Sequence, residues 1–290
     1  MPTIDIKGIP HAYELYPSSV ASASSRPVLV FIHGWLLSRH YWKPLATRLC
    51  EHYQCLIYDL RGFGESILTK GDKTSVFSYT LAAYANDLKI LLEKLDIDQA
   101  WLIGHSLGGS IALWGADICP EQVQGVICLN SGGGIYLKEE FERFRSVGKR
   151  IVKQRPVWLS FVPLLDLVFA RMMVEKPLSR QWGKQRLIDF FKADQAAALG
   201  SLLESTTETE VHLLPQVVSR LQQPVYFLAG QNDKIMELQY IHHLASFHPL
   251  FHSCEGNVLE IPNCGHLAMI EQPDLVEDKI TQILNQYVKG

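Results

Sequence analysis

Ser106 stands in the stretch Gly104-His105-Ser106-Leu107-Gly108, with one glycine two residues before it and another two residues after it. The preceding residues form a short apolar run that predicts a strand, and the following residues predict a helix. On so tight a turn the backbone crowds the serine unless its neighbours at these two positions lack side chains. The turn would expose the hydroxyl and direct the first helical amides toward it. The pattern predicts a nucleophilic serine, although a lone G-x-S-x-G can also mark an ordinary turn.

A serine hydroxyl needs a general base, and the base needs an acid that holds it in one tautomer. Asp233, in "LAGQNDKI", and His266, in "IPNCGHLAMIEQP", each follow a predicted strand. Because the carboxyl ends of parallel strands meet at one edge of a sheet, we expect Ser106, Asp233 and His266 to lie together there. Asn130 holds a competing strand-end position, but an amide cannot supply the anion.

Two backbone N–H groups would have to stabilise the oxyanion that forms when the serine attacks a carbonyl group. The amide of Leu107, directly after the serine, is one predicted donor. The stretch "FIHGWLLS" supplies the other, and Trp35 is the predicted donor because Gly34 lets the backbone turn inward. This chemistry requires no metal and no organic cofactor, and the sequence predicts neither.

Apolar runs and amphipathic segments alternate along the chain around these residues. Such alternation is typical of right-handed βαβ units, so we expect an α/β fold with a mostly parallel central sheet and helices on both faces. Strands are predicted within 27–34, 53–66, 100–106, 123–133, 224–230 and 257–262, and helices within 78–96, 107–120, 236–247 and 273–288.

The alternation stops after residue 134 and resumes near residue 223. We therefore expect 1–134 and 223–290 to form one sheet domain, and 135–222 to form an inserted helical lid over the strand ends, here called the cap. Within the cap, 156–174 is apolar on nearly all sides. Three interpretations fit this segment: a buried helix, the wall of a tunnel for a hydrocarbon substrate, or a patch that contacts a membrane surface.

Five residues near the serine or in the cap are predicted to contact the substrate. They are His105, Trp158, Phe161, Phe169 and Met172. Long hydrocarbon groups gain about 0.8 kcal/mol for each buried CH₂, and the apolar cap side chains suit such a group.

The composition of the 290 residues, 47% hydrophobic and 20% charged, is that of an ordinary globular protein. A net charge of −3 gives no basic field for nucleic-acid phosphates, so no nucleic-acid partner is expected. The polar first residues lack the pattern of a signal peptide, and the six cysteines are scattered without metal-binding spacing. A cytoplasmic protein is expected, with peripheral membrane contact through the cap as an addition, and the oligomeric state stays open.

Five stretches resemble the α/β-hydrolase superfamily in their order and spacing: "FIHGW", "YDLRGFGES", "GHSLGG", "AGQNDKI" and "CGHLAMIEQP". The resemblance covers nearly the whole chain apart from the cap. It implies Ser106 as nucleophile, Asp233 as acid and His266 as base, and it assigns Asp59 and Arg61 to a structural loop. The implied reaction is hydrolysis of a carboxylic ester through an acyl-enzyme. The cap favours an ester with a long or bulky apolar part.

Within the superfamily, the apolar cap and "CLNSGGGIY" are similar to cyanobacterial and plastid hydrolases related to chlorophyll dephytylase. A second resemblance, through "FIHGWLLSRHYW", is to the pyruvate-eliminating synthase of menaquinone and phylloquinone biosynthesis, a lyase with the same triad. That family typically has an arginine where this chain has Ser110, although Arg145, Arg150, Arg155 or Arg171 of the cap could replace it. Hydrolases of carbon–carbon bonds are a third alternative. A ligand receptor on a hydrolase scaffold is a fourth, but it would not require an intact triad.

Overall fold

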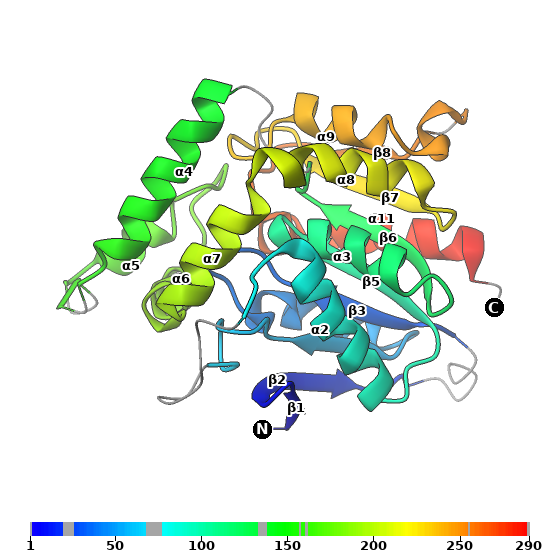
Figure 1. Ribbon diagram of the computed structural model, residues 1–290, viewed down its shortest axis with the longest axis horizontal. Coiled ribbons are helices and arrows are strands. Elements are labelled where there is room, and N and C mark those ends of the chain that lie inside the picture. Colours follow the sequence, from blue (N-terminus) through cyan, green and yellow to red (C-terminus); the bar gives the residue numbers. More distant parts are fainter. Residues whose placement is uncertain are drawn as a thin grey trace.

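An eight-stranded sheet forms the centre of the molecule (Figure 1). The computed structural model describes residues 2–19, 26–67, 77–132, 138–156, 158–159, 162–254 and 256–288, without the side chains of 138–141. The strands are β1 (Thr3–Ile6), β2 (Ile9–Tyr16), β3 (Val28–Ile32), β4 (Cys55–Tyr58), β5 (Ala100–His105), β6 (Val123–Leu129), β7 (Val225–Gly230) and β8 (Val258–Ile261). Their order is β1-β2-β4-β3-β5-β6-β7-β8, and every pair is parallel except β1 with β2 and β2 with β4. The predicted α/β fold with a mostly parallel sheet is confirmed.

Helices follow most strands and pack on both faces of the sheet (Figure 1). The 3₁₀ helices are η2 (Arg39–Trp42) and η5 (Pro249–His252). The α-helices are α1 (Lys43–Leu49), α2 (Leu81–Lys94), α3 (Leu107–Ile118), α4 (Lys138–Lys153), α5 (Leu165–Phe169), α6 (Arg180–Lys192), α7 (Gln195–Ser205), α8 (Glu208–Arg220), α9 (Leu238–Ala245), α10 (Ala268–Glu271) and α11 (Pro273–Tyr287).

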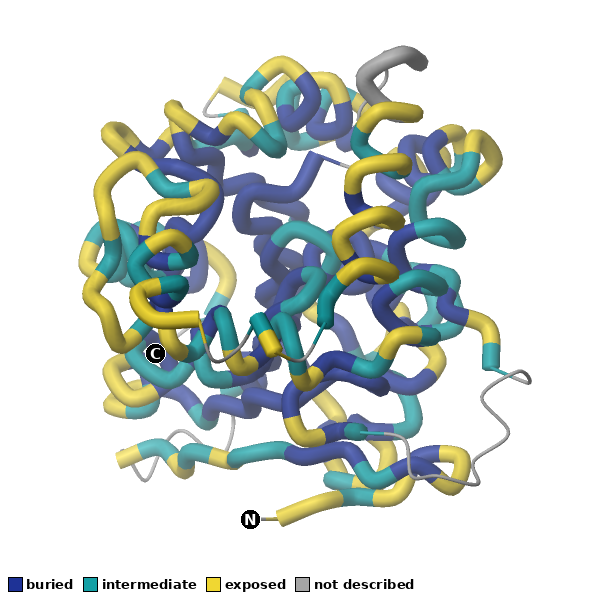
Figure 2. The backbone as a smooth tube through the Cα atoms, turned by 90° about the vertical axis from the view of Figure 1, so that its left-hand side faces the viewer, coloured by how far each residue is buried: buried dark blue, intermediate teal, exposed yellow. Residues whose placement is uncertain are grey.

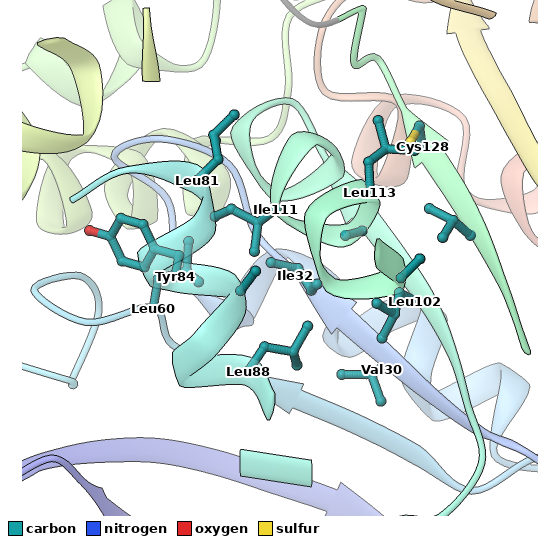
Figure 3. Close-up of a cluster of buried hydrophobic side chains, with 14 of the residues drawn as sticks. Val30, Ile32, Leu60, Leu81, Tyr84, Leu88, Leu102, Ile111, Leu113 and Cys128 are labelled. Atoms are coloured by element: carbon teal, nitrogen blue, oxygen red, sulfur yellow. The ribbon is translucent and has the colours of Figure 1, made fainter. Parts of the chain in front are cut away.

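The central strands are apolar on both faces because helices cover both. Successive side chains of a strand point to opposite faces, and β3 divides in this way. Val30 and Ile32 pack with buried residues of α2 and α3, as Figure 3 shows, whereas Leu29 and Phe31 join a second cluster with α1 and α11. This sandwich fixes the register of the strands and therefore the place where each one ends.

The N-terminal hairpin of β1 and β2 was not predicted. Its turn is Lys7-Gly8, with positive φ at both residues, which suits a tight hairpin. Ile6 and Ile9 are buried, while the intervening turn is exposed. The signal in the sequence was the Lys7-Gly8 turn between Ile6 and Ile9, and the polar character of the segment obscured it.

The helices α4 to α8 lie between β6 and β7 in the chain, within the range expected for the cap. However, α8 packs on α3 and α9, and its residues Leu214, Val217 and Val218 are buried in the main core cluster. The helix α8 thus fills part of the helical layer on the sheet, although it lies within the range 135–222 expected for the cap.

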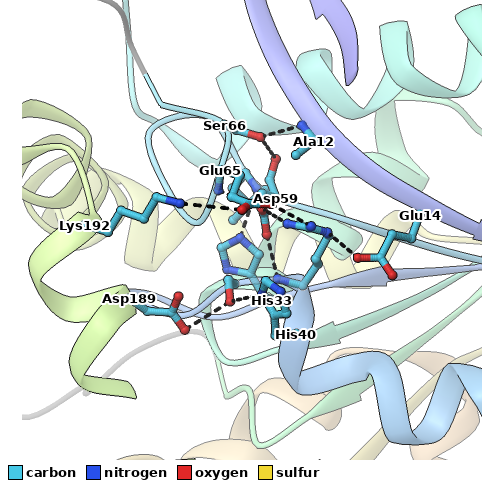
Figure 4. A network of polar contacts seen from close by, with 12 residues as sticks. Ala12, Glu14, His33, His40, Asp59, Glu65, Ser66, Asp189 and Lys192 are labelled. Atoms are coloured by element: carbon cyan, nitrogen blue, oxygen red, sulfur yellow. Dashed lines mark hydrogen bonds and ion pairs between the residues drawn. The ribbon is translucent and has the colours of Figure 1, made fainter. Parts of the chain in front are cut away.

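A polar network joins α6 of the cap to the loops that follow β3 and β4 (Figure 4). The Ser38 hydroxyl donates to the Asp189 carboxylate at 3.0 Å, and the Lys192 ammonium lies 3.7 Å from the Glu65 carboxylate. Beneath it, the buried side chains of Arg39 and Asp59 form an ion pair. Asp59 thus holds the loop in place, which agrees with the structural role that the resemblance implies.

Candidate active site

Ser106 occupies a strained turn between β5 and α3. Its backbone has φ 52° and ψ −118°, which an L-residue adopts only when its surroundings impose it. A Cβ atom at Gly104 would lie 2.2 Å from the carbonyl oxygen of Gly108, and one at Gly108 would lie 2.2 Å from that of Ile32. Glycine is therefore the residue that fits on both sides of the serine.

Hydrogen bonds hold this strained backbone from both neighbouring elements. The Ser106 N–H donates to the carbonyl oxygen of Leu129 at 3.0 Å, which ties the turn to the end of β6. The Ser106 carbonyl oxygen accepts from the Ser131 hydroxyl at 2.8 Å and from the Gly109 N–H at 3.0 Å. The serine is thereby fixed at the carboxyl edge of the sheet.

Asp233 and His266, which were singled out by their strand-end positions, form a buried hydrogen-bonded pair. The His266 Nδ1–H donates to Asp233 Oδ2 at 2.7 Å, and the two residues are 3% and 4% exposed. The N–H groups of Ile235 and Met236 donate to Asp233 Oδ1 at 2.8 and 3.0 Å. With Nδ1 carrying the proton, Nε2 of His266 is the basic nitrogen.

Asn130 also binds Asp233, a contact that was not predicted. Its amide donates to Asp233 Oδ2 at 2.8 Å and to the Gly265 carbonyl oxygen at 3.1 Å. Asn130 follows β6, and β6 pairs with β7, which carries Asp233 just beyond its end. The sequence excluded Asn130 as the anionic partner of His266, and in the structure Asn130 donates to the expected partner, Asp233.

The environment of Asp233 favours its charged form. Burial alone would raise the pKa of this carboxyl, but the charge and hydrogen bond of His266, together with the donors Met236 and Asn130, outweigh burial and lower the pKa. Asp233 thus stays ionised beside His266, where its negative charge would stabilise a protonated imidazole.

His105 connects the Ser106 turn to residues 262–267, the loop that carries His266 and is here called the histidine loop. Its Nε2–H donates to the His266 carbonyl oxygen at 2.7 Å, and the two rings lie 4.8 Å apart. Burial, followed by the charge of His266, lowers the pKa of His105 to about 3, so the ring is neutral. His105 is only 1% exposed. The expectation of a substrate contact is therefore corrected: its burial makes it a support for the loop.

The N–H groups of Leu107 and Trp35 are the two expected oxyanion donors. Leu107 is the first residue of α3, so its N–H has no partner within the helix. Within the described residues, neither this N–H nor that of Trp35 donates a backbone hydrogen bond. Gly34, just before Trp35, lies so close to His105 that a Cβ would be 2.6 Å from its Nδ1. The Trp35 loop therefore lies directly beside the serine turn.

The expected substrate contacts of the cap lie at its surface or outside the described residues. Trp158 is 64% exposed and Met172 is 40% exposed, while Phe169 is half-buried and packs on Phe190. Phe161 lies outside the described residues. The structure does not bring these side chains together with the triad, and contact with a substrate remains a prediction for them.

A short backbone segment of the cap, residues 172–175, lies against the histidine loop and is here called the strap. The His266 N–H donates to the Met173 carbonyl oxygen at 2.9 Å. At Gly265 a Cβ atom would lie 2.8 Å from the backbone of Val174, so glycine permits the close approach. The Arg186 guanidinium, buried in α6, donates to the carbonyl oxygens of Phe169 and Met172 at 2.5 and 2.6 Å and so holds the strap from the other side.

Glu271 binds both the histidine loop and the strap. Its carboxylate accepts from the N–H groups of Gly265 at 3.0 Å and Leu267 at 2.9 Å, on either side of His266. It also accepts from the Glu175 N–H at 2.8 Å. The prediction missed Glu271, although it stands five residues after His266 in the stretch "CGHLAMIEQP".

None of the helices in the described parts of the chain has both the length and the apolar character that spanning a bilayer demands. In the same parts, His, Cys, Asp and Glu do not gather in groups of three or more that could hold a metal ion.

Comparisons with known proteins bear on the family and the fold of the chain. Residues 27–171 match the family described as alpha/beta hydrolase fold. An uncharacterized hydrolase of Bacillus subtilis (strain 168) is 25% identical over 288 residues, which cover 96% of each chain. A 2-succinyl-6-hydroxy-2,4-cyclohexadiene-1-carboxylate synthase of Photorhabdus laumondii is 29% identical over 252 residues, covering 84% of this chain and 81% of that protein. A thermophilic esterase from Thermogutta terrifontis has the same fold, with a TM-score of 0.74 at 24% identity over 98% of this chain and 96% of that one.

Proposed function

Since the chain belongs to the α/β-hydrolase family, we propose that it is a serine hydrolase that cleaves carboxylic esters with an apolar part. The observation that carries this proposal is the buried Asp233–His266 hydrogen bond at the sheet edge where the strained Ser106 turn also lies. Acyl transfer needs a nucleophile, a general base and an acid, and the resemblance assigned Ser106, His266 and Asp233 to these roles.

The proposed reaction has two halves. His266 Nε2 removes the Ser106 proton while the hydroxyl oxygen attacks the ester carbonyl carbon, and Asp233 stabilises the imidazolium. The N–H groups of Trp35 and Leu107 stabilise the oxyanion, and the alcohol leaves with the proton from His266. Water then attacks the acyl-enzyme by the same route and releases the acid.

The synthase is the second candidate because the Photorhabdus relative is 29% identical over most of both chains. Its family's arginine is replaced by the nearly buried Ser110. Two of the cap arginines that could substitute are bound to backbone carbonyl oxygens: Arg145 to Leu203 and Arg155 to Ala193. Their use in holding the cap together favours the esterase over the lyase.

A paired assay of wild type and Ser106→Ala tests the proposal. p-Nitrophenyl esters of increasing acyl length are compared with the pyruvate-releasing quinone precursor. Each buried CH₂ contributes about 0.8 kcal/mol, so kcat/KM should rise about fourfold per carbon of the acyl chain, as long as each added carbon becomes buried. Loss of ester hydrolysis in Ser106→Ala, with thermal unfolding unchanged, supports the proposal. Rapid pyruvate release with negligible ester cleavage would overturn it in favour of the lyase.

Chlorophyll is the specific bulky ester that we propose to test next, because of the similarity of the cap and of "CLNSGGGIY" to the dephytylase group. The measurement is formation of chlorophyllide from solubilised chlorophyll by enzyme already active on a model ester. Absence of chlorophyllide from such enzyme would reject this substrate and leave the broader ester proposal intact.

A further inference from the structure

Exposed apolar side chains are concentrated on the cap. Nine of the twelve exposed large apolar residues found in the described parts of the chain fall between residues 147 and 188. They stand on α4, on α6 and on the connection between these helices that includes α5. These helices make up the side at the left of Figure 1, which faces the viewer in Figure 2. The nine are Val147, Ile151, Trp158, Val162, Leu164, Val168, Met172, Met173 and Ile188.

The same part of the chain is strongly basic. Residues 138–192 contain 13 Lys and Arg against six Asp and Glu, a net charge of +7 in a chain whose total is −3. The remainder of the chain therefore carries −10. Among the described side chains of 142–192, exposed cations outnumber exposed anions by nine to two. The exposed cations are Arg143, Lys149, Arg150, Lys153, Arg171, Lys176, Arg180, Lys184 and Lys192.

On α4 the two kinds of side chain are arranged in order around the helix. Gly148 and Val152 are buried, and Gly148 lies against Leu202 of α7. Val147 and Ile151, four residues apart, form an exposed apolar flank beside that buried face. Arg143 and Arg150 lie farther around on the same side, where their stems can extend along an apolar layer and their guanidinium groups stay in water.

We propose that this cap face, made of the exposed apolar and basic residues of 143–192, lies on the surface of a membrane that contains anionic lipids. Its apolar side chains would enter the headgroup region, and its cations would meet the negative lipid headgroups. A second copy of the chain fits less well, because a two-fold contact would bring two faces of the same positive charge together.

Sedimentation with lipid vesicles tests the proposal directly. The probes are vesicles of phosphatidylcholine alone and of phosphatidylcholine with phosphatidylglycerol, at low and at physiological ionic strength. We expect the protein to sediment with the anionic vesicles and much less with the neutral ones, and to bind more weakly as salt rises. Ser106→Ala protein should bind as the wild type does, which separates this interaction from the proposed hydrolysis and makes failure of either one distinguishable.

Matched variants locate the contact. The double variant Lys149→Gln/Arg150→Gln on α4 should weaken binding to anionic vesicles roughly 30-fold. Lys89→Gln/Lys94→Gln, which removes the same charge from α2 on the sheet domain, should leave it unchanged. Trp158→Ala should weaken binding through loss of an interfacial aromatic residue, whereas Phe247→Ala, another exposed aromatic outside the cap, should not.

Three results would overturn the proposal. One is no binding to anionic vesicles by protein with a normal thermal unfolding transition. Another is equal loss of binding in the cap variants and their matched controls. The third is a dimer, measured by light scattering, that Trp158→Ala converts to monomers, since this would show that a second copy covers the face.

Discussion

Four hydrogen-bond donors reach the buried Asp233 carboxylate. His266 and Asn130 donate to Oδ2, and the backbone N–H groups of Ile235 and Met236 donate to Oδ1. A buried charge is costly unless it is matched in this way. The donors keep the Asp233 carboxyl ionised, and its hydrogen bond with His266 fixes the orientation of the imidazole ring.

Asp233→Asn should therefore reduce kcat roughly 10³- to 10⁴-fold on a good ester substrate, because an amide neither stabilises the imidazolium nor selects the correct tautomer. Steady-state kinetics and a thermal unfolding curve are the measurements. Asp278→Asn, at an exposed carboxyl on α11, is the control and should retain activity. A variant at Asp233 that keeps more than a tenth of wild-type kcat would show that Asp233 is not the acid.

At the scale of residues, local motifs were enough to single out Ser106 with its flanking glycines and the strand-end residues Asp233 and His266. The structure joins Asp233 and His266 by a hydrogen bond. Asn130 escaped prediction because its contact depends on which strand lies beside β7. The burial of His105 escaped it too, since burial is set by how the histidine loop folds over the turn.

Glu271 links elements that are distant in the chain. Its carboxylate binds one N–H on each side of His266 and one in the strap, so it holds the base and the cap backbone in a fixed relation. It touches no reacting atom in this arrangement and acts as a positioning residue.

We expect Glu271→Gln to lower kcat roughly 10- to 100-fold with a much smaller change in KM, because a neutral amide offers one acceptor oxygen to three N–H donors and lets the base shift. Kinetics across a pH range, with the kcat and KM profiles recorded separately, is the readout. Glu277→Gln, which removes a carboxylate that pairs with Arg48 on the surface, is the matched control. Equal effects of the two variants, or an effect on KM alone, would argue against positioning.

Asp189 lies where α6 meets the loop after β3, and it is 2% exposed. Burial raises the pKa of this carboxyl to about 7, although hydrogen bonds from Ser38 and Gln185 act in the opposite direction. The folded protein thus holds a proton here that the unfolded chain, with a pKa near 4, releases. Between about pH 4 and pH 7 this group makes stability fall as pH rises, and above about pH 7 its effect is constant.

Asp189→Asn should remove this contribution, so the free energy of unfolding should decline less between about pH 5 and pH 7 than in the wild type, by on the order of 1 kcal/mol for each pH unit. Urea unfolding at several pH values measures it. Asp278→Asn should follow the wild-type slope. If Asp189→Asn follows that slope as well, the carboxyl is ionised throughout the range.

At the scale of elements, alternating apolar runs predicted the parallel strands and the helices between them to within a few residues. For example, the helix expected within 78–96 is α2, Leu81–Lys94. The hairpin β1–β2 escaped prediction because its alternation is short and interrupted by polar residues. Contacts such as that of α6 with the β3 loop could not be predicted, because they depend on three-dimensional packing of segments more than 100 residues apart.

At the scale of the whole molecule, some helices of the inserted segment pack in the core and others are exposed, and their order in the chain does not reveal which. The helix α8 stands in the inserted segment, yet its Leu214 is fully buried in the main core, while Val168 of α5 is 53% exposed. The pause in strand alternation predicts an inserted segment at 135–222, and the helices α4 to α8 fall within that range. It could not show which inserted helices serve the core, since both kinds are rich in leucine and valine.

Leu214→Ala should therefore destabilise the whole protein by about 2–5 kcal/mol through a cavity in the core. Val168→Ala should change the free energy of unfolding by less than about 0.5 kcal/mol, as an exposed position does. Urea unfolding followed by circular dichroism gives both values. A small effect of Leu214→Ala would place α8 outside the cooperative core.

The strap meets the histidine loop through the carbonyl group of Met173 and the backbone of Val174, and its Glu175 N–H binds the Glu271 carboxylate. The side chains of the strap differ in their surroundings: Val174 packs on the apolar cluster that includes Leu267, Arg186 contacts the Met173 sulfur, and Met172 is 40% exposed. Met172 is therefore a position whose side chain can be exchanged while the backbone contacts at His266 stay in place. Variation there would let the surface of the cap evolve without altering the proposed base.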